Sequence, residues 1–428
     1  MARFVVAHAT HPDWRAALAL CSAQLDTSSG SAAAGEVAAP TLGWIYFSDH
    51  YAAHAAALFA ALQDRWPGVA WVGAVGVGVA ANGVEYFDEP ALVMMLAAMP
   101  IGRFQVFSGA QPLSRIQAHT AMVHTDGSAH DLASLLEEMS SRTTSGYLFG
   151  GLASSRTRSC HIANGVFEGG LSGVAFSRDV GVLSRVSQGC QPIGPTRLIT
   201  ACERNVVTQL DGEPALACLL RDLGLDGQAP RETLAALRST LVGLSGPAER
   251  DAAAAAGSEG ISEKPDPLSQ AAARRAFGED VRVRHLIGLD PAHHGVAVAE
   301  LLHTGLSLAF CQRDMAAARR DLVRICAETR EALAPDPEAD AAGAMRLSPM
   351  ATAVPSGPID PTARIAGAVY VSCAGRGGPH FGAPSAELQI IKHALGDVPL
   401  VGFFAGGEIG HQHLYGYTGV LTVFTRGA

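Results

Sequence analysis

Apolar residues in this chain occur in short runs that end at glycines. Between Val398 and Phe424, one apolar run meets a glycine cluster that contains a single acid, Glu408, and a second apolar run follows. Short apolar runs bounded by glycine are typical of strands joined by a tight loop, because glycine allows backbone angles that other residues avoid. This stretch is therefore predicted to form a strand, a glycine loop and a second strand.

The same pattern occurs in two earlier stretches, residues 69–96 and 146–176. The glycines Gly73, Gly151 and Gly402 precede the second apolar run of each stretch by 18, 20 and 17 residues. Upstream of each glycine, another apolar run ends in small polar residues and leads into a helix-like segment. The chain is therefore predicted to use one unit of strand, polar loop, helix, strand, glycine loop and strand at least three times. Ordinary alternation within an α/β fold is the alternative interpretation.

Amphipathic periodicity and capping signals place helices between these strands. Helices are predicted at residues 13–25, 51–65, 130–141, 215–222 and 315–333. Further strands are predicted at residues 42–47, 180–190, 281–289 and 306–311, whereas residues 100–113 are expected to be irregular. The pattern predicts an α/β fold of two domains with mixed sheets and outer helices, built from repeated strand–helix–strand units.

Changes in composition along the chain suggest where its domains end. Residues 243–275 and 334–361 are rich in alanine, glycine, serine and proline and lack apolar periodicity, so they are predicted to be flexible insertions. The most plausible boundary lies within residues 211–225. The expected domains are therefore residues 1–212 and 213–428.

Composition excludes several classes of protein. The 428 residues are 48% hydrophobic and 17% charged, which is typical of a globular chain. The net charge of −9 argues against a nucleic-acid partner, because phosphate-binding surfaces carry a basic excess. No uninterrupted apolar run is long enough to span a membrane. The eight cysteines are scattered without a C-x-x-C pair, so we expect reduced thiols and a cytoplasmic location.

Motifs that would indicate an enzyme have the wrong spacing. Ser48, Asp49 and His50 are adjacent along a predicted strand, so their side chains alternate between faces and do not form a proton relay. The segment GAVGVG at residues 73–78 has a different glycine order from a dinucleotide-binding loop. His411 and His413 lack a nearby carboxylate with metal-ligand spacing. We therefore predict no catalytic residues, no metal and no cofactor.

Several stretches, taken together, resemble the FIST domain family. The N-terminal part of the resemblance is carried by GAVGVGVAANGVEYFDEPALVMMLAAMP, LFGGLASS and SQGCQPIGPTRLITACERNVVTQLDGEPAL. The C-terminal part is carried by LIGLDP, FCQRDMAAARRDL, SCAGRG and GFFAGGEIGHQHLYGYTGVLTVF. The resemblance covers residues 42–424 apart from the two insertions, and it implies a FIST N-terminal domain followed by a FIST C-terminal domain.

The resemblance implies a sensory module of intracellular signal transduction that binds a small ligand, possibly an amino acid or a derivative, and that has a possible protein partner in signalling. A protein-interaction scaffold without a ligand and an enzyme of unknown reaction are the alternatives. Two residues depart from the family pattern. His411 stands where relatives commonly have proline, and Tyr415 where they often have histidine. The ligand therefore need not be the one that other members bind.

Two loops of the C-terminal unit form the predicted ligand site. The first is SCAGRG, in which Arg376 is expected to face a ligand carboxylate, and the second is GGEIG, in which Glu408 is expected to face a ligand ammonium. Structural pairing of Arg376 with Glu408 or with a backbone carbonyl is the alternative, as is an inert, buried Cys373. The predicted ligand-binding residues are Ser372, Cys373, Arg376, Gly377, Gly406, Gly407, Glu408 and Tyr415.

Overall fold

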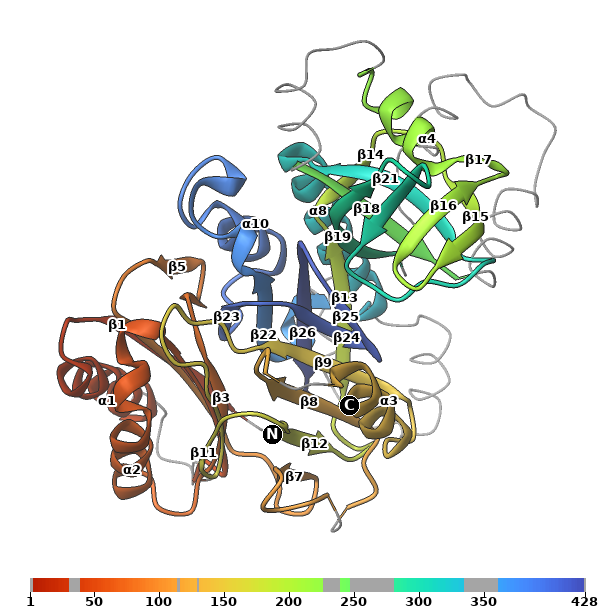
Figure 1. Cartoon of the computed structure of the whole chain (residues 1–428). Coiled ribbons are helices and arrows are strands. Elements are labelled where there is room, and N and C mark those ends of the chain that lie inside the picture. The colour runs from red at the N-terminus through yellow and green to blue at the C-terminus, as the bar shows by residue number, and fades with distance from the viewer. Residues whose placement is uncertain are drawn as a thin grey trace, which may run out of the picture. The chain divides into compact units, whose positions relative to one another are not determined.

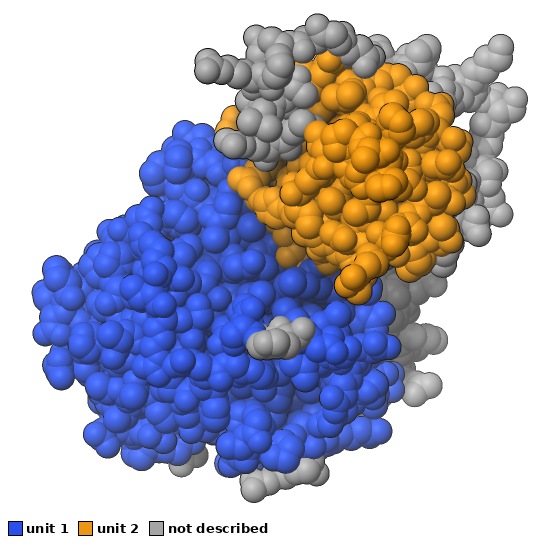
Figure 2. All heavy atoms as spheres, viewed as in Figure 1, with its two compact units in different colours: residues 1–187, 319–414, 418–428 blue, residues 188–318, 415–417 orange. Residues whose placement is uncertain are grey.

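The computed structural model describes residues 3–30, 39–113, 116–128, 131–225, 239–246, 281–334 and 361–426 (Figure 1). The chain forms two compact units (Figure 2). Unit 1 comprises Met1–Ser187, Arg319–Leu414 and Thr418–Ala428, and unit 2 comprises Gln188–Ala318 and Tyr415–Tyr417. The units are thus divided differently from the sequential halves 1–212 and 213–428, because unit 2 interrupts unit 1.

Most of the two predicted insertions lie outside the described residues. The exception is the beginning of the first, because residues 243–245 belong to a strand, β18 (Thr240–Ser245). The prediction of an irregular insertion is therefore wrong for these three residues. Leu244 points into an apolar core, which fixes the end of the strand.

Unit 1 contains three copies of one order of elements, as the spacing of the glycines predicts, but each predicted glycine loop contains a hairpin of two short strands. The first copy is β2 (Leu42–Ser48), α2 (Ala55–Arg65), β3 (Ala70–Gly76), β4 (Gly78–Ala81), β5 (Val84–Phe87) and β6 (Ala91–Ala97). The second is β8 (Thr120–Thr125), α3 (Leu132–Ser141), β9 (Tyr147–Leu152), β10 (His161–Ala163), β11 (Val166–Phe167) and β12 (Leu171–Phe176). The third is β22 (Ile365–Cys373), α10 (Ala386–Leu395), β23 (Leu400–Ala405), β24 (Glu408–His411), β25 (His413–Tyr415) and β26 (Thr418–Thr425).

The three copies exchange their hairpins in a cycle. Each copy contributes three strands to the middle of a mixed sheet, in which its first two strands run parallel. The hairpin β4–β5 joins the sheet of the third copy, β10–β11 joins that of the first, and β24–β25 joins that of the second. Every sheet therefore contains strands from two copies, so the copies cannot fold as independent domains.

A further strand completes each sheet at the opposite edge. These strands are β1 (Phe4–Thr10), β7 (Phe104–Phe107) and β13 (Val182–Gln188). In the first copy, α1 (Trp14–Gly30) follows the added strand and covers the outer face of β1 and β6 (Figure 1). In the third copy, the residues of unit 2 and of α8 (Met315–Ala332) come between β13 and β22 in the order of the chain. Unit 2 is thus an insertion into the third copy.

One glycine in each copy lies where two parallel strands approach too closely for a side chain. A Cβ added at Gly73 would lie 1.7 Å from a carbonyl oxygen of the neighbouring strand, at Gly150 1.9 Å, and at Gly402 1.8 Å. The crowded glycine of the second copy is therefore Gly150, which directly precedes the Gly151 used in the sequence spacing. Gly151 pairs one position further along with His124.

These crowded glycines give the first testable prediction. Gly73→Ala and Gly402→Ala are each expected to lower the free energy of unfolding by about 2–3 kcal/mol, because the paired strands must spread to admit a methyl group. Urea denaturation of the purified variants measures the effect. Gly109→Ala is the control, since no atom lies within 4 Å of an added Cβ at that position. Equal stability of all three variants would contradict the assigned register.

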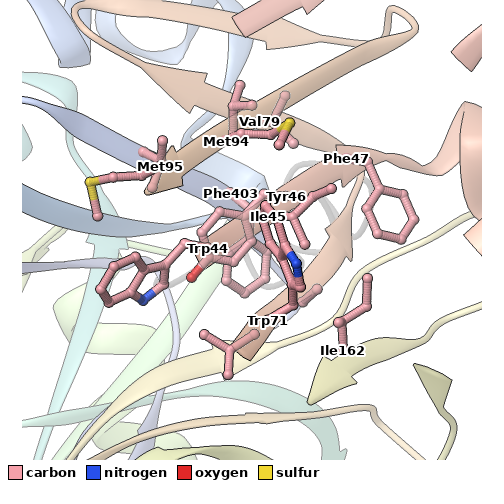
Figure 3. Packing of buried hydrophobic residues seen from close by; sticks show 14 of the residues in the cluster. Trp44, Ile45, Tyr46, Phe47, Trp71, Val79, Met94, Met95, Ile162 and Phe403 are labelled. Carbon is pink, nitrogen blue, oxygen red and sulfur yellow. The ribbon is translucent and has the colours of Figure 1, made fainter. Parts of the chain in front are cut away.

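The core of unit 1 lies where the three sheets face one another. Tyr46 of the first copy stacks on Phe403 of the third, with ring centroids 4.9 Å apart (Figure 3). The Tyr46 hydroxyl lies 3.2 Å from Nε2 of His124 in the second copy, and His124 is fully buried. Burial lowers the pKa of His124 to about 3, with a smaller contribution from His161. All three copies therefore contribute to one continuous core.

Unit 2 is a closed antiparallel β-barrel. Its ring contains β15 (Arg197–Glu203), β16 (Val206–Leu210), β20 (Gly295–Val298), β19 (Arg282–Asp290), β18 and β21 (Ser307–Arg313), and β18 pairs with β21 to close it. The short strands β14 (Cys190–Pro192) and β17 (Glu213–Pro214) pair with β21 and β16. The buried ion pair of Arg197 with Asp222, at 2.6 Å, joins α4 (Ala215–Asp222) to the barrel.

The predicted helices agree with the structure except at their ends. The helix at 215–222 has the expected bounds, and that at 315–333 ends one residue earlier. The strand β7 is a correction, because residues 100–113 were expected to be irregular. None of the helices in the described part of the chain has the length and apolar character needed to cross a bilayer.

Candidate functional site

The two predicted site loops begin at the same end of neighbouring strands. β22 and β23 run parallel, and Cys373 at the end of β22 pairs with Ala405 at the end of β23. SCAGRG and GGEIG therefore leave the sheet together, at the carboxyl ends of the strands where ligands of open α/β sheets bind. This convergence is the one expected from the order of the elements.

The chain after β22 forms two short turns instead of continuing as a helix. These are η3 (Ala374–Arg376) and η4 (Gly378–Phe381), and we call residues 374–381 the arginine loop. Gly378 has a φ of 67°, which favours glycine, and Pro379 follows it. An added Cβ at Gly377 would lie 2.1 Å from the Phe87 ring. These constraints hold the arginine loop against β5 of the first copy.

Arg376 is buried in an ion pair. Its Nη2 lies 2.6 Å from Oε1 of Glu387, its Nε donates to the same oxygen at 2.9 Å, and Nη1 donates to the Ser187 carbonyl at 3.2 Å. The hydroxyls of Tyr370 and Ser372 donate to Glu387 at 2.6 and 2.9 Å. Burial opposes the charge of Arg376, but Glu387 outweighs it and raises the pKa of the guanidinium.

Glu387 was not among the predicted partners of Arg376. It lies in the first turn of α10, with 1% of its surface exposed. An acid in the first turn of a helix usually faces solvent and stabilises the helix dipole, so its position in the sequence does not indicate a buried ion pair. Only the packing of α10 against β22 brings the two charges together.

Glu408 begins β24 and is also fully buried. Its Oε2 accepts hydrogen bonds from the Thr418 amide at 3.1 Å and from the Thr418 hydroxyl at 2.7 Å. Its Oε1 accepts no hydrogen bond of normal geometry from any described residue. Burial raises the pKa of Glu408 to about 8, although Thr418, Arg376 and the neighbouring Cys373 each lower it. One carboxyl oxygen is therefore available for another partner.

The repeated architecture shows that the fold does not require an acid at this position. Each exchanged hairpin pairs with the sheet of another copy, and that sheet contains one crowded glycine. One hairpin residue in each copy pairs with the residue directly after this glycine. These residues are Val79, His161 and Glu408. Because a valine occupies the equivalent position of the first copy, an ionisable side chain is not needed for the hairpin to join its sheet. Glu408 is therefore a candidate for function.

A third acid, Glu85, contacts the arginine loop from β5. Its Oε1 accepts a hydrogen bond from the Gly378 amide at 3.0 Å. Burial raises the pKa of Glu85 to about 7, and the charge of Glu387 raises it further, while backbone hydrogen bonds lower it. Sequence reasoning missed Glu85 because it arrives with the hairpin of the first copy, almost 300 residues away in the chain. The arginine loop is thus in contact with Glu85 through its backbone and with Glu387 through its guanidinium.

The other predicted site residues have structural contacts of their own. Gly406 and Gly407 exchange backbone hydrogen bonds with Leu152, at 3.0 and 2.8 Å, and so connect the loop to β9. Cys373 is buried, as its alternative interpretation expects. Tyr415 is grouped with unit 2, where it is 2% exposed. Seven of the eight predicted site residues therefore lie in unit 1, whereas Tyr415 belongs to unit 2.

Ser48 and Asp49, which were rejected as members of a proton relay, have structural partners of their own. Ser48 accepts a hydrogen bond from the Ala91 amide at 2.9 Å, and both carboxylate oxygens of Asp49 accept hydrogen bonds from Arg156 at 2.7–2.9 Å. Nowhere in the described ranges do three or more histidine, cysteine, aspartate or glutamate side chains gather with a geometry for a metal ion.

Comparison with known proteins gives two family matches and a set of relatives. Sequence models of the FIST N domain and the FIST C domain match residues 41–213 and 215–411. The uncharacterized protein Rv0628c of Mycobacterium tuberculosis is 29% identical over 449 residues, which cover 99% of each chain. The uncharacterized protein Mb0898c of Mycobacterium bovis is 27% identical over 409 residues, which cover 91% of this chain and 92% of its own.

Proposed function

Because the chain belongs to the FIST family, with the FIST N and FIST C domains in that order, we propose that it is a sensory module that binds a small amine-bearing ligand, such as an amino acid or a derivative, beside Glu408. FIST domains are associated with sensing in signal transduction. The observation that carries the proposal is a buried carboxyl group that the fold does not require and whose Oε1 accepts no hydrogen bond of normal geometry from the described residues, the Cys373 thiol being its one weak contact there.

The distribution of charge favours an ammonium as the group that is bound. Glu85, Glu387 and Glu408 face the arginine loop, whereas Arg376 is the cation that pairs with Glu387. A ligand carboxylate would have to compete with Glu387 for the guanidinium. At Glu408 an ammonium competes with the thiol of Cys373, which is a weak donor, and not with a paired carboxylate. A charge-assisted hydrogen bond from the ammonium satisfies the buried acceptor better than the thiol does. The amine is therefore the anchored part of an amino-acid ligand.

Access to Glu408 requires movement, because no part of its surface is exposed. The arginine loop has two consecutive glycines, Gly377 and Gly378, at which its backbone can turn. Displacement of this loop would uncover the carboxyl ends of β22 and β23. Ligand binding and a change in the position of the loop are therefore coupled, which is what a sensor needs in order to pass on a signal.

Binding of an ammonium is expected to depend on pH. The pKa of Glu408 is about 8, so the carboxyl group is mostly protonated at pH 6 and must lose a proton to pair with a cation. The affinity should rise about tenfold for each pH unit between pH 6 and 8 and then level off. Calorimetric titration with L-leucine, isoamylamine and N-acetyl-L-leucine tests this, and the N-acetyl compound should not bind.

The matched variant separates the site from non-specific binding. Glu408→Gln should weaken amine binding by about 1.5–3 kcal/mol and remove its pH dependence, because the amide carries no charge. Glu89→Gln, at an exposed glutamate, should leave the affinity for amines and its pH dependence unchanged. If the amines bind Glu408→Gln as tightly as the parent protein, the site is elsewhere.

A further inference from the structure

Unit 1 contains a surface cavity whose lining residues are remote in sequence from the arginine loop. It has a volume of about 540 Å³, within the range of about 300–1,000 Å³ that is usual for small-molecule sites. Its lining residues come from β7, from the loops on either side of β7 and from three turns of the first two copies. They are Thr41, Gly68, Ala70, Ile101, Gly102, Phe104, Gln105, Val106, Ala110, Gln111, Pro112, Ile116 and Asn164.

The cavity lies beside a place where the second copy departs from the other two. A helix follows the added edge strand in the first copy, and α8 precedes β22 in the third. Between β7 and β8, the described residues form no helix. Ala110, Gln111 and Ile116 of this connection line the cavity. The cavity is thus bordered by a segment whose structure differs from that of the corresponding segments in the other two copies.

The lining is uncharged as far as the described residues form it. None of the thirteen residues has an ionisable side chain, and the set combines aliphatic and aromatic groups with amides and one hydroxyl. At the cavity, Ile101 exposes 88% of its surface, which a ligand with an apolar face would cover. A charged ligand would lose its hydration without gaining a counter-charge. The composition of the cavity therefore selects a neutral molecule.

Asn164 provides a fixed hydrogen-bonding group in this lining. It lies in the tight turn between β10 and β11, and its Oδ1 accepts a hydrogen bond from the Trp71 amide at 2.8 Å. This bond orients the side-chain amide, so that Nδ2 is the donor that remains, and Nδ2 donates to none of the described residues. A ligand with a carbonyl or another acceptor would satisfy Nδ2.

We propose that this cavity is a binding site for an uncharged small molecule that has a flat apolar body and a hydrogen-bond acceptor, such as a ring that carries a carboxamide. The site differs from that of Glu408 in the chemistry it accepts, since one selects a cation and the other a neutral group. None of the residues around the arginine loop lines this cavity. Either proposal can therefore fail without the other.

Three probes of one shape and different charge test the proposal: benzamide, benzamidine and benzoate. Titrations followed by ligand-observed NMR are expected to give a dissociation constant for benzamide at least tenfold below those of the charged probes. Ala110→Trp, which fills the cavity from an exposed position, should abolish benzamide binding. Ala110→Ser and Glu408→Gln should retain it.

Asn164→Asp supplies a second, independent test. Aspartate keeps the acceptor for the Trp71 amide and tolerates the positive φ of 53° at this position. Aspartate replaces the free donor by a negative charge. The variant should therefore bind benzamide at least tenfold more weakly than the parent protein does, and it should bind benzamidine instead. The proposal is overturned if the charged probes bind the parent protein as tightly as benzamide. It is equally overturned if Asn164→Asp leaves the order of the three affinities unchanged.

Discussion

Replacement of Arg376 by methionine is expected to lower the free energy of unfolding by about 3–5 kcal/mol. Methionine fills most of the volume of the arginine side chain but leaves Glu387 buried, with 1% of its surface exposed, and without its counter-charge. Removal of one member of a buried ion pair lowers stability by more than the pair contributes to it, because the remaining charge is buried away from water. Urea denaturation at pH 7, followed by circular dichroism, measures the change.

The double variant Arg376→Met/Glu387→Gln separates the contribution of the arginine's charge to stability from the contribution of its packing. The hydroxyls of Tyr370 and Ser372 donate to different oxygens of Glu387, and glutamine retains an acceptor for one of them without leaving a buried charge, so much of the lost stability should return. If the double variant is as unstable as Arg376→Met, the arginine stabilises the protein by packing and not through its charge. The amine-binding proposal does not depend on the outcome, because it rests on Glu408.

The second large effect is expected from Glu408→Gln at alkaline pH. The pKa of this carboxyl group rises on folding from 4.5 to about 8, so the folded state binds the proton more tightly than the unfolded state. The contribution of this group to stability is therefore fully present below pH 4.5 and is lost as the pH rises through about 8. Glutamine cannot ionise and avoids this loss. Between pH 5 and pH 8, the free energy of unfolding of the variant should rise by about 3.5 kcal/mol relative to that of the parent protein.

Parallel urea titrations of the two proteins at pH 5, 6.5 and 8 test this prediction. Glu85 has a pKa raised in the same direction, but it is present in both proteins and cancels in the difference. Glu89→Gln, at an exposed site, should show no such trend. A difference that stays constant with pH would mean that Glu408 is ionised in the folded protein throughout this range.

A gain in stability together with a loss of amine binding would show what Glu408 does. The equivalent residue of the first copy is Val79, so the fold accepts an apolar side chain at this position. A buried carboxyl group that destabilises the protein near neutral pH is then retained for binding. Stability given up at a functional position is a common feature of binding sites.

The sequence determined the local elements, because they depend on periodicity and on glycine. The bounds of α4 follow from the proline before it and from its amphipathic pattern. The spacing of Gly73, Gly151 and Gly402 indicated that one order of elements is repeated. Which glycine of each copy leaves no room for a side chain, Gly73, Gly150 or Gly402, follows only from the strand register.

The tertiary structure alone decided which copies share a sheet and which charges meet. Strand patterns do not specify a partner, so the exchange of hairpins and the closure of the barrel by β18 and β21 are absent from any local signal. Glu85 and Glu387 reach the arginine loop through that exchange and through the packing of α10. The pKa of Glu408 likewise depends on burial by residues distant in the chain, because solvent exclusion is a property of the folded assembly of the three copies.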